Sequence, residues 1–355
     1  MITLILIIIV ISVLILVHEW GHFYSARKFG VKVEEFGFGF PPKVASRVKN
    51  GVRYSLNLFP FGGFVKIYGE HGEGEQDAKS FMSRPVWQRF TILAAGVFMN
   101  FLLAWVFFSV GATLGVPTIS GDNSSGIPVS VIGISHGSPA ETVGLHFGDK
   151  ILEMKANGFS LRIESEKDIR DFVDAYRGEE IILVIGRGKE MKEIKAVPRA
   201  EYPEGEGPLG IAIARLQVKK APIYMAPVEG ARTLFFSTQA TAGGLLGIIK
   251  ELFTKGKTSA DVSGPVGIFF FADDTRTLGI AYFLQFIGLL SVNLAILNFL
   301  PIPALDGGRI LFLAIEKVKG SRVNPRIENL AHTIGFALLI LLMVLVTYKD
   351  VVRIL

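Results

Sequence analysis

The sequence His-Glu-Trp-Gly-His at residues 18–22 places two histidines and a carboxylate at a spacing that can do chemistry. On an α-helix, residues four apart lie on one face, so His18 and His22 can offer their imidazoles to a single metal ion. Glu19 lies beside them, and its carboxylate can take a proton from metal-bound water. The chain has only 6 histidines in 355 residues, so chance does not readily produce this pattern. The alternative is a hydrogen-bonded pair of helix histidines without a metal.

Two histidines leave a catalytic zinc site incomplete, because such a site has three protein ligands and one open position. The chain contains no cysteine, so the third ligand must be His, Asp or Glu. Asp306 is the strongest candidate, because it follows an apolar segment in the sequence Pro-Ile-Pro-Ala-Leu-Asp-Gly-Gly of residues 301–308. Irregular backbone at membrane depth lines a protein cavity, and an ionisable residue there is functional by default. Alternatively, Asp306 only caps the helix that begins there.

Apolar helices must position these residues. Half of the chain is hydrophobic and the mean hydropathy is +0.45, well above the values of ordinary soluble domains. A membrane-spanning helix needs roughly 20 apolar residues. Four segments approach or exceed that length, and they are residues 2–29, 90–116, 278–300 and 334–348. We therefore predict an integral membrane protein, whose last helix is short unless its flank from residue 330 contributes.

Residues 2–17 carry no charge and resemble the apolar part of a signal peptide. No basic region precedes them, no small-residue cleavage pattern follows them, and cleavage would destroy the His-Glu motif. We interpret this segment as the first membrane helix.

The charges of the loops predict the orientation. Residues 23–89 carry 11 Lys and Arg against 6 Asp and Glu, and residues 301–329 also carry a basic excess. Residues 117–277 carry slightly more acidic than basic side chains. By the positive-inside rule, loops 23–89 and 301–329 face the cytoplasm, while the N-terminus and the large middle loop face outward. The pI of about 9.2 therefore reflects topology, and we find no nucleic-acid signature.

The loops also contain predicted structure. Residues 31–69 alternate and are rich in aromatic and β-branched side chains, which predicts short strands and hairpins. Residues 59–64, Phe-Pro-Phe-Gly-Gly-Phe, are too apolar for a cytoplasmic loop. Because lipid cannot satisfy strand edges, we expect this hairpin to be buried against the helices or to line a cavity near the site. In the middle loop, residues 129–132 and 181–185 predict strands and residues 166–176 an amphipathic helix.

The chain thus divides into four parts. Residues 1–116 hold the first two membrane helices and the membrane-associated hairpin, and residues 127–215 form a small inserted α/β domain. Residues 224–277 are an amphipathic connecting segment that packs against the helices or lies along the membrane surface. Residues 278–355 hold the last two membrane helices.

These motifs together resemble the site-2 protease family of intramembrane zinc metalloproteases. Residues 18–22 and 298–307 resemble its H-E-x-x-H and N-x-x-P-x-P-x-L-D-G motifs. Residues 96–100 resemble its G-x-x-x-N element, residues 62–66 its membrane-associated hairpin, and residues 263–267 a further family motif. The resemblance runs nearly end to end and includes the bacterial RseP-like topology of four helices.

The middle domain resembles a PDZ domain. Its residues 138–140, 148–152 and 157–158 resemble the PDZ signature. Pro-Leu-Gly-Ile at residues 208–211 resembles a peptide-binding loop, placed as in circularly permuted bacterial PDZ domains. The peptide-binding residues that this implies are Leu209, Gly210 and Ile211. The enterobacterial type carries two PDZ domains, whereas this chain has room for one.

Carried over by position, the family resemblance implies that His18, His22 and Asp306 bind one zinc ion per chain. Glu19 would then be the general base.

The resemblance also implies a substrate-binding set. Asn100 and Asn298 would hold the substrate backbone or the oxyanion, and Gly62 and Gly63 would belong to the substrate-binding hairpin. Alternatively, the two asparagines are polar contacts that hold membrane helices together.

The implied function is zinc-dependent intramembrane endopeptidase activity in the bacterial cytoplasmic (inner) membrane. The substrates would be single-pass membrane proteins that another protease has trimmed, such as anti-sigma factors or remnant signal peptides. One alternative is a catalytically silent adaptor or chaperone with the same fold, which the intact Glu19 argues against. Another is a zinc transporter or sensor, which the lack of a His-rich loop argues against.

Overall fold

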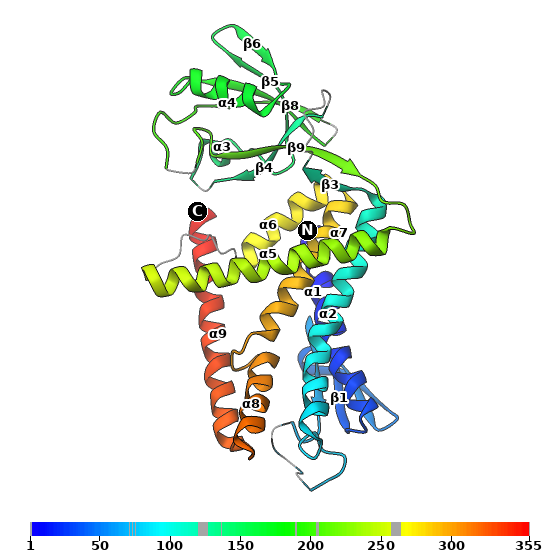
Figure 1. Ribbon diagram of the computed structural model, residues 1–355. Helices are drawn as coiled ribbons and strands as arrows, with labels where there is room; N and C mark the ends of the chain where they lie inside the picture. Colours follow the sequence, from blue (N-terminus) through cyan, green and yellow to red (C-terminus); the bar gives the residue numbers. More distant parts are fainter. Residues whose placement is uncertain are drawn as a thin grey trace. The chain divides into compact units, whose positions relative to one another are not determined.

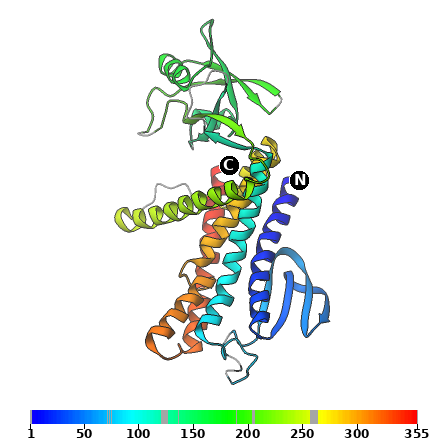
Figure 2. The same cartoon turned by 45° about the vertical axis from the view of Figure 1, so that its right-hand side comes forward.

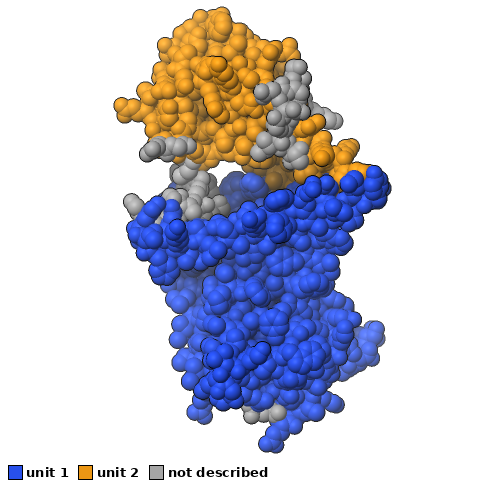
Figure 3. All heavy atoms as spheres, in the orientation of Figure 1, with its two compact units in different colours: residues 1–111, 223–273, 284–355 blue, residues 112–222, 274–283 orange. Residues whose placement is uncertain are grey.

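The computed structural model describes residues 2–70, 72, 74, 76–119, 127–135, 137–188, 190–203, 206–256 and 264–354. The chain divides into two compact units, coloured separately in Figure 3. The first, which we name the helical unit, contains residues 1–111, 223–273 and 284–355. The second, the sheet unit, contains residues 112–222 and 274–283. Ser263 of the predicted 263–267 motif lies outside the described residues.

Four helices of the described chain are long and apolar enough to cross a membrane, which confirms the four predicted segments. They are α1 (Ile2–Lys28), α2 (Val86–Leu114), α7 (Ile280–Phe299) and α9 (Pro325–Ile354). The last is 30 residues long, so it begins earlier than the apolar pattern predicts. Pro325 fits the first turn of a helix, and the Asn324 side chain accepts a hydrogen bond from the Arg326 N–H.

The predicted hairpin region is present as two long antiparallel strands, β1 (Val33–Lys49) and β2 (Val52–Ile67). Each strand bends, so that residues 33–38 pair with residues 63–67 on one side, and residues 35–38 pair with residues 53–56 on the other. Residues 63–67 are therefore an edge of this sheet, which we name the edge arm. Figure 2 shows the sheet beside α1.

Two glycines let the edge arm approach α1. A Cβ on Gly62, whose φ is +80°, would lie 2.9 Å from Ile15 Cδ1, and one on Gly63 would lie 3.0 Å from Leu16 Cδ2. The Ser12 hydroxyl also donates to the Pro60 carbonyl at 2.7 Å. The apolar hairpin is thus packed against a membrane helix, as expected from its composition.

The predicted connecting segment folds into helices α5 (Ala226–Lys255) and α6 (Pro265–Leu278). Helix α5 crosses the apolar helices of its unit at a steep angle (Figure 1). Trp105 Nε1–H of α2 donates to the Pro227 carbonyl at 2.9 Å, and Thr241 of α5 donates to Asn293 of α7 at 3.0 Å.

The start of α6 is fixed by α9. The buried Asp350 carboxylate accepts hydrogen bonds from the backbone N–H groups of Gly264 at 3.1 Å and Gly267 at 3.0 Å. Gly264 immediately precedes α6 and Gly267 lies in its first turn, where N–H groups have no intrahelical partner.

The sheet unit has the strand order β3-β9-β4-β5-β7-β8, with β6 paired to β5. Its strands are β3 (Val116–Ile119), β4 (Val129–Ile134), β5 (Lys150–Ala156), β6 (Phe159–Arg162), β7 (Ile181–Arg187), β8 (Glu190–Ala196) and β9 (Ile211–Lys219). Helices α3 (Pro139–Thr142) and α4 (Glu166–Ala175) accompany them. The predicted strands and amphipathic helix are confirmed as β4, β7 and α4. Ile151, Leu183 and Phe172 belong to a core within this unit.

Candidate metal centre and active site

The His-Glu motif lies in the C-terminal half of α1, where α1 and α2 come very close. A Cβ on Gly21 would collide with the Ala95 carbonyl oxygen of α2. His18 and His22 are both 5% exposed, and their Nε2 atoms lie 3.1 Å apart. The helical spacing therefore brings the two imidazoles to one point, as the sequence predicts.

Asp306 is the first residue of α8 (Asp306–Lys319), which follows the irregular turn after α7. The residue at the N-cap is Leu305, and no side chain caps this helix. A Cβ on Gly307 would collide with the Leu300 carbonyl, and one on Gly308 with the Ile302 carbonyl. The two glycines thus let the first turn of α8 pack on the preceding turn. The Asp306 carboxylate is directed at the histidines rather than used as a cap.

Two further helices hold this turn in place. The Ala304 N–H donates to His332 Nδ1 of α9 at 2.8 Å, and Arg89 of α2 donates to Glu316 of α8 at 2.9 Å. Arg309 of α8 pairs with Glu70 in the loop after β2. Asp306 therefore sits on a segment that is fixed from several sides.

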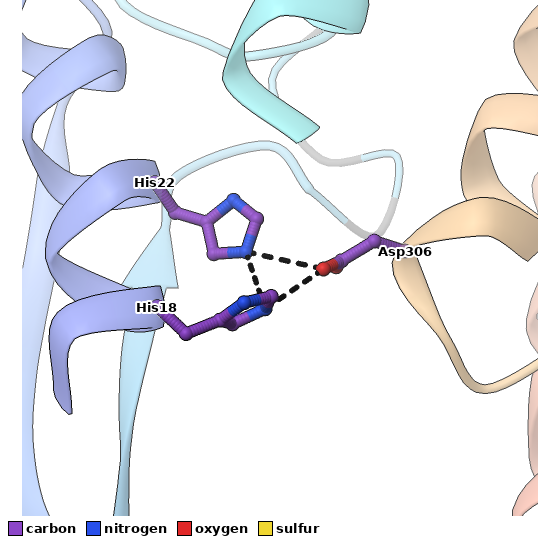
Figure 4. Close-up of side chains that lie close together, drawn as sticks. All are labelled: His18, His22 and Asp306. Atoms are coloured by element: carbon purple, nitrogen blue, oxygen red, sulfur yellow. Dashed lines mark hydrogen bonds and ion pairs between the residues drawn. The ribbon is translucent and has the colours of Figure 1, made fainter. Parts of the chain in front are cut away.

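The three candidate ligands converge (Figure 4). Asp306 Oδ2 lies 2.9 Å from His18 Nε2 and 3.3 Å from His22 Nε2. All three candidate ligand atoms lie within 4.8 Å of one another. A tetrahedral zinc ion with bonds of about 2.0–2.2 Å separates its ligand atoms by about 3.3–3.6 Å. Two imidazole nitrogens and one carboxylate oxygen at nearly this separation fit zinc in both chemistry and size.

The tautomer of His22 suits a metal ligand. Its Nδ1 lies 2.8 Å from the Ile92 carbonyl oxygen of α2. A carbonyl only accepts, so Nδ1 carries the proton and donates it. Nε2 of the neutral ring then keeps its lone pair, directed toward Asp306 and His18. Metal-binding histidines are commonly oriented in this way.

Glu19 is held by the edge arm. Its Oε2 accepts a hydrogen bond from the Val65 N–H of β2 at 3.0 Å. Because this N–H points toward α1, the outer edge of the arm faces the carboxylate. Glu19 therefore lies between the histidines on its own helix and an open strand edge.

The two predicted asparagines lie at opposite ends of the His18 ring. Asn298 Nδ2, near the end of α7, is 3.3 Å from His18 Nε2, the nitrogen that faces Asp306. Asn100 Nδ2, in α2, is 3.3 Å from His18 Nδ1 and is fully buried. Only Asn298 lies on the side where the candidate ligands converge.

The remaining predicted residues are not members of this cluster. Gly62 and Gly63 pack on α1 at the start of the edge arm. In the sheet unit, the Leu209 side chain is part of the core, so only its backbone could meet a peptide. Gly210 has a φ of +70°, and its carbonyl accepts from the Ser135 N–H. Ile211 begins β9.

Three features of the site were not predicted from the sequence. The Ile92 carbonyl and the Val65 N–H are backbone groups, which leave no signature in a sequence. The third is the space at Gly96, where a Cβ would collide with His22 Nε2 and lie 2.8 Å from His18 Cε1. The G-x-x-x-N element contains this glycine, so that motif was the available signal.

Comparison with known proteins decides the family. Residues 6–342 match Peptidase family M50. The chain belongs to this family. Its members are site-2 proteases, so the predicted family is confirmed, and the protein is a multipass membrane metalloprotease of that type.

Bacterial relatives match over nearly the whole chain. A protein of Clostridium acetobutylicum is 35% identical over 349 residues, which cover 97% of this chain and 96% of that protein. Zinc metalloprotease RasP of Shouchella clausii is 30% identical, and the match covers 98% of this chain and 98% of that protein. Regulator of sigma-W protease RasP of Bacillus subtilis is 31% identical, with 99% of this chain and 98% of that protein covered.

A solved structure matches part of the chain. The PDZ domain of an SdrC-like protein from Listeria monocytogenes is 24% identical and covers 24% of this chain and 87% of its own, with a TM-score of 0.21. A score this low assigns no fold.

Proposed function

We propose that this chain is a zinc-dependent endopeptidase that cleaves single-pass transmembrane segments within the bacterial cytoplasmic membrane. One zinc ion per chain would be held by His18, His22 and Asp306. The observation that carries the proposal is the convergence of these three side chains beside Glu19. The two histidines and Glu19 belong to α1, which is long and apolar enough to span a membrane, and Asp306 lies at the start of α8.

The chemistry divides between the metal and the protein. Zinc bound here would supply Lewis acidity, which lowers the pKa of a water molecule and polarises a carbonyl group. Glu19 acts as the general base. Its Oε2 is engaged by the Val65 N–H, which leaves Oε1 to take the proton from water and return it to the leaving amide nitrogen.

The edge arm is the proposed substrate-binding strand. A helical substrate satisfies its own backbone, so it must unwind before a peptide bond is exposed. The unwound stretch can add to residues 63–67 as a further strand. Because the Val65 N–H points toward Glu19, a strand added along this edge passes beside the catalytic carboxylate.

Asn298 is the proposed hydrogen-bond donor to the scissile carbonyl of the substrate. Its side-chain amide lies 3.3 Å from His18 Nε2, on the side where the ligands converge, and it is partly exposed. An amide N–H in that position can donate to the oxygen of a scissile carbonyl as negative charge develops on it.

The middle domain is proposed to select substrates. We assign residues 127–215 as a single PDZ-like domain, extracytoplasmic together with the N-terminus, with loops 23–89 and 301–329 in the cytoplasm. Its residues 208–211 would bind a new C-terminus, or the domain would exclude substrates that another protease has not trimmed. One relative is named as a regulator of sigma-W protease, so anti-sigma factors are candidate substrates beside remnant signal peptides.

The test is co-expression with a tagged single-pass helix whose extracytoplasmic part is already truncated. We expect wild type to cleave it within the membrane, and Glu19→Gln to reduce cleavage by at least ~100-fold, since general base catalysis contributes about 10²–10⁴-fold. Glu190→Gln, on the exposed strand β8, is the matched control and should cleave as wild type does. Equal cleavage by wild type and Glu19→Gln would overturn the assignment of Glu19 as the general base.

A further inference from the structure

We propose that Asn100 is a positioning residue for His18: its side-chain oxygen accepts the His18 Nδ1–H and so directs Nε2 at the metal. This inference rests on the zinc centre proposed above. It gives Asn100 a different role from Asn298, although the two look alike in sequence.

Asn100 is fixed at both its backbone and its side chain. The hydroxyl of Ser291 in α7 donates to the Asn100 carbonyl at 2.8 Å, and both residues are fully buried. The Asn100 side-chain amide lies 3.3 Å from His18 Nδ1. A substrate cannot reach a side chain with no exposed surface, so a direct role in substrate binding is excluded by access. What remains within reach is the imidazole.

The contact is made at the end of the ring that faces away from the ligand cluster. His18 Nε2 lies 2.9 Å from Asp306 Oδ2 and 3.3 Å from Asn298, whereas Nδ1 meets Asn100. A metal ligand needs an unprotonated nitrogen, so the single proton of a neutral His18 must sit on Nδ1. That proton needs an acceptor.

The Asn100 amide can supply this acceptor. Its oxygen and nitrogen exchange places when the amide turns by a half rotation, and the two orientations have the same shape. With the nitrogen toward His18, the buried Oδ1 has no hydrogen-bond partner among the described residues. With the oxygen toward His18, Oδ1 accepts the Nδ1–H. When Nδ1 carries the proton, the first orientation sets two donors against each other and leaves the acceptor unpaired, so the second orientation is favoured, on the scale of about 1–3 kcal/mol for a buried polar group without its hydrogen bond.

His22 provides an internal precedent. Its Nδ1 donates to the Ile92 carbonyl, also on α2. Ile92, Gly96 and Asn100 are spaced by four, so they share one face of α2. That face gives each histidine an acceptor, and Gly96 between them leaves room for the two rings. Orienting contacts of this kind change metal affinity about 10–100-fold when removed.

The test is zinc affinity of the purified full-length protein, measured by competition with a chelator. Asn100→Leu removes the acceptor at similar volume and should weaken zinc binding about 10–100-fold. Asn100→Asp keeps an acceptor facing Nδ1–H and should bind zinc as tightly as wild type or more tightly. Asn329→Leu, the same substitution at an exposed asparagine of α9, is the matched control and should change affinity less than ~3-fold.

Each outcome decides the proposal. Wild-type affinity in Asn100→Leu, or an equal loss in Leu and Asp variants that both stay folded, would overturn it in favour of simple helix packing. If the Leu variant does not fold, Asn100→Asp still decides, because the proposal requires the folded Asp variant to retain zinc. Absence of zinc from wild type would instead refute the metal centre itself.

Discussion

His18 and Asp306 are 288 positions apart in the chain, yet His18 Nε2 and Asp306 Oδ2 lie 2.9 Å apart. This contact depends on two separate features of local packing. The first is the close approach of α1 and α2 at Gly21, and the second is the glycine pair that packs α8 onto the turn after α7. The geometry of the candidate metal centre therefore depends on backbone spacing as well as on its three side chains.

Gly96→Ala tests this sensitivity. The added methyl group would collide with His22 Nε2, so the histidines must move apart. We expect zinc affinity to fall at least ~10-fold, because losing the contacts that orient metal-binding side chains lowers metal affinity by about 10–100-fold. Gly243→Ala, in α5 with open space around it, is the control and should be neutral or slightly stabilising. Unchanged zinc affinity in Gly96→Ala would show that the site adapts freely.

Val65→Pro tests the contact between the edge arm and the general base. Proline removes the N–H that binds Glu19 Oε2, so kcat should fall at least ~10-fold while zinc content stays at the wild-type value. Val65→Ala keeps this N–H and should retain most of the activity. Equal activities of the Pro and Ala variants, measured on the truncated reporter, would contradict the role of this hydrogen bond.

Asp350→Ala tests the connection between α9 and α6. Its loss leaves the N–H groups of Gly264 and Gly267 without their acceptor in a buried position. We expect the free energy of unfolding to fall by about 1–3 kcal/mol with zinc affinity retained. Asp174→Ala removes an exposed ion pair with Arg177 and should cost less than about 1 kcal/mol. Thermal unfolding in detergent measures the stability of both variants. Equal losses would contradict a stabilising role for the hydrogen bonds between Asp350 and the start of α6.

The sheet unit supplies a pH prediction at α4. Burial by itself raises the pKa of Asp168, but hydrogen bonds from the Glu164 N–H and from Ser165 outweigh it and hold the pKa below 3.8. A lowered pKa in the folded state adds stability above pH 3.8, and this stability is lost as the pH falls through the folded value.

The measurement is hydrogen exchange of α4 amides, as the ratio of Asp168→Ala to wild type. At pH 7 a lost cap of about 1 kcal/mol speeds exchange about 5-fold. The ratio should shrink toward one well below pH 3.8, because the wild-type carboxyl is then protonated. A ratio independent of pH would show that the charge of Asp168 contributes nothing.

The chemistry-bearing residues could be predicted from the sequence because each is a rare polar group in an apolar setting. His18, His22 and Asp306 stand out for that reason, and the structure brings them together. The hairpin could also be predicted, because residues 31–69 alternate and are rich in aromatic and β-branched side chains.

Other features could not be predicted. Asn100 and Asn298 are both amides in apolar helices, and the sequence does not show that Asn100 lies fully buried at His18 Nδ1 while Asn298 lies partly exposed at Nε2. The acceptor for His22 and the donor to Glu19 are backbone groups, whose positions follow from packing rather than from residue type.

Zinc content of the purified full-length protein tests the central claim most directly. Wild type should carry one zinc ion per chain, and Asp306→Ala should lose most of it while staying folded, because two histidines alone leave the site short of a ligand. Equal zinc content in wild type and Asp306→Ala, or a folded and active wild type without zinc, would contradict the proposed metal centre.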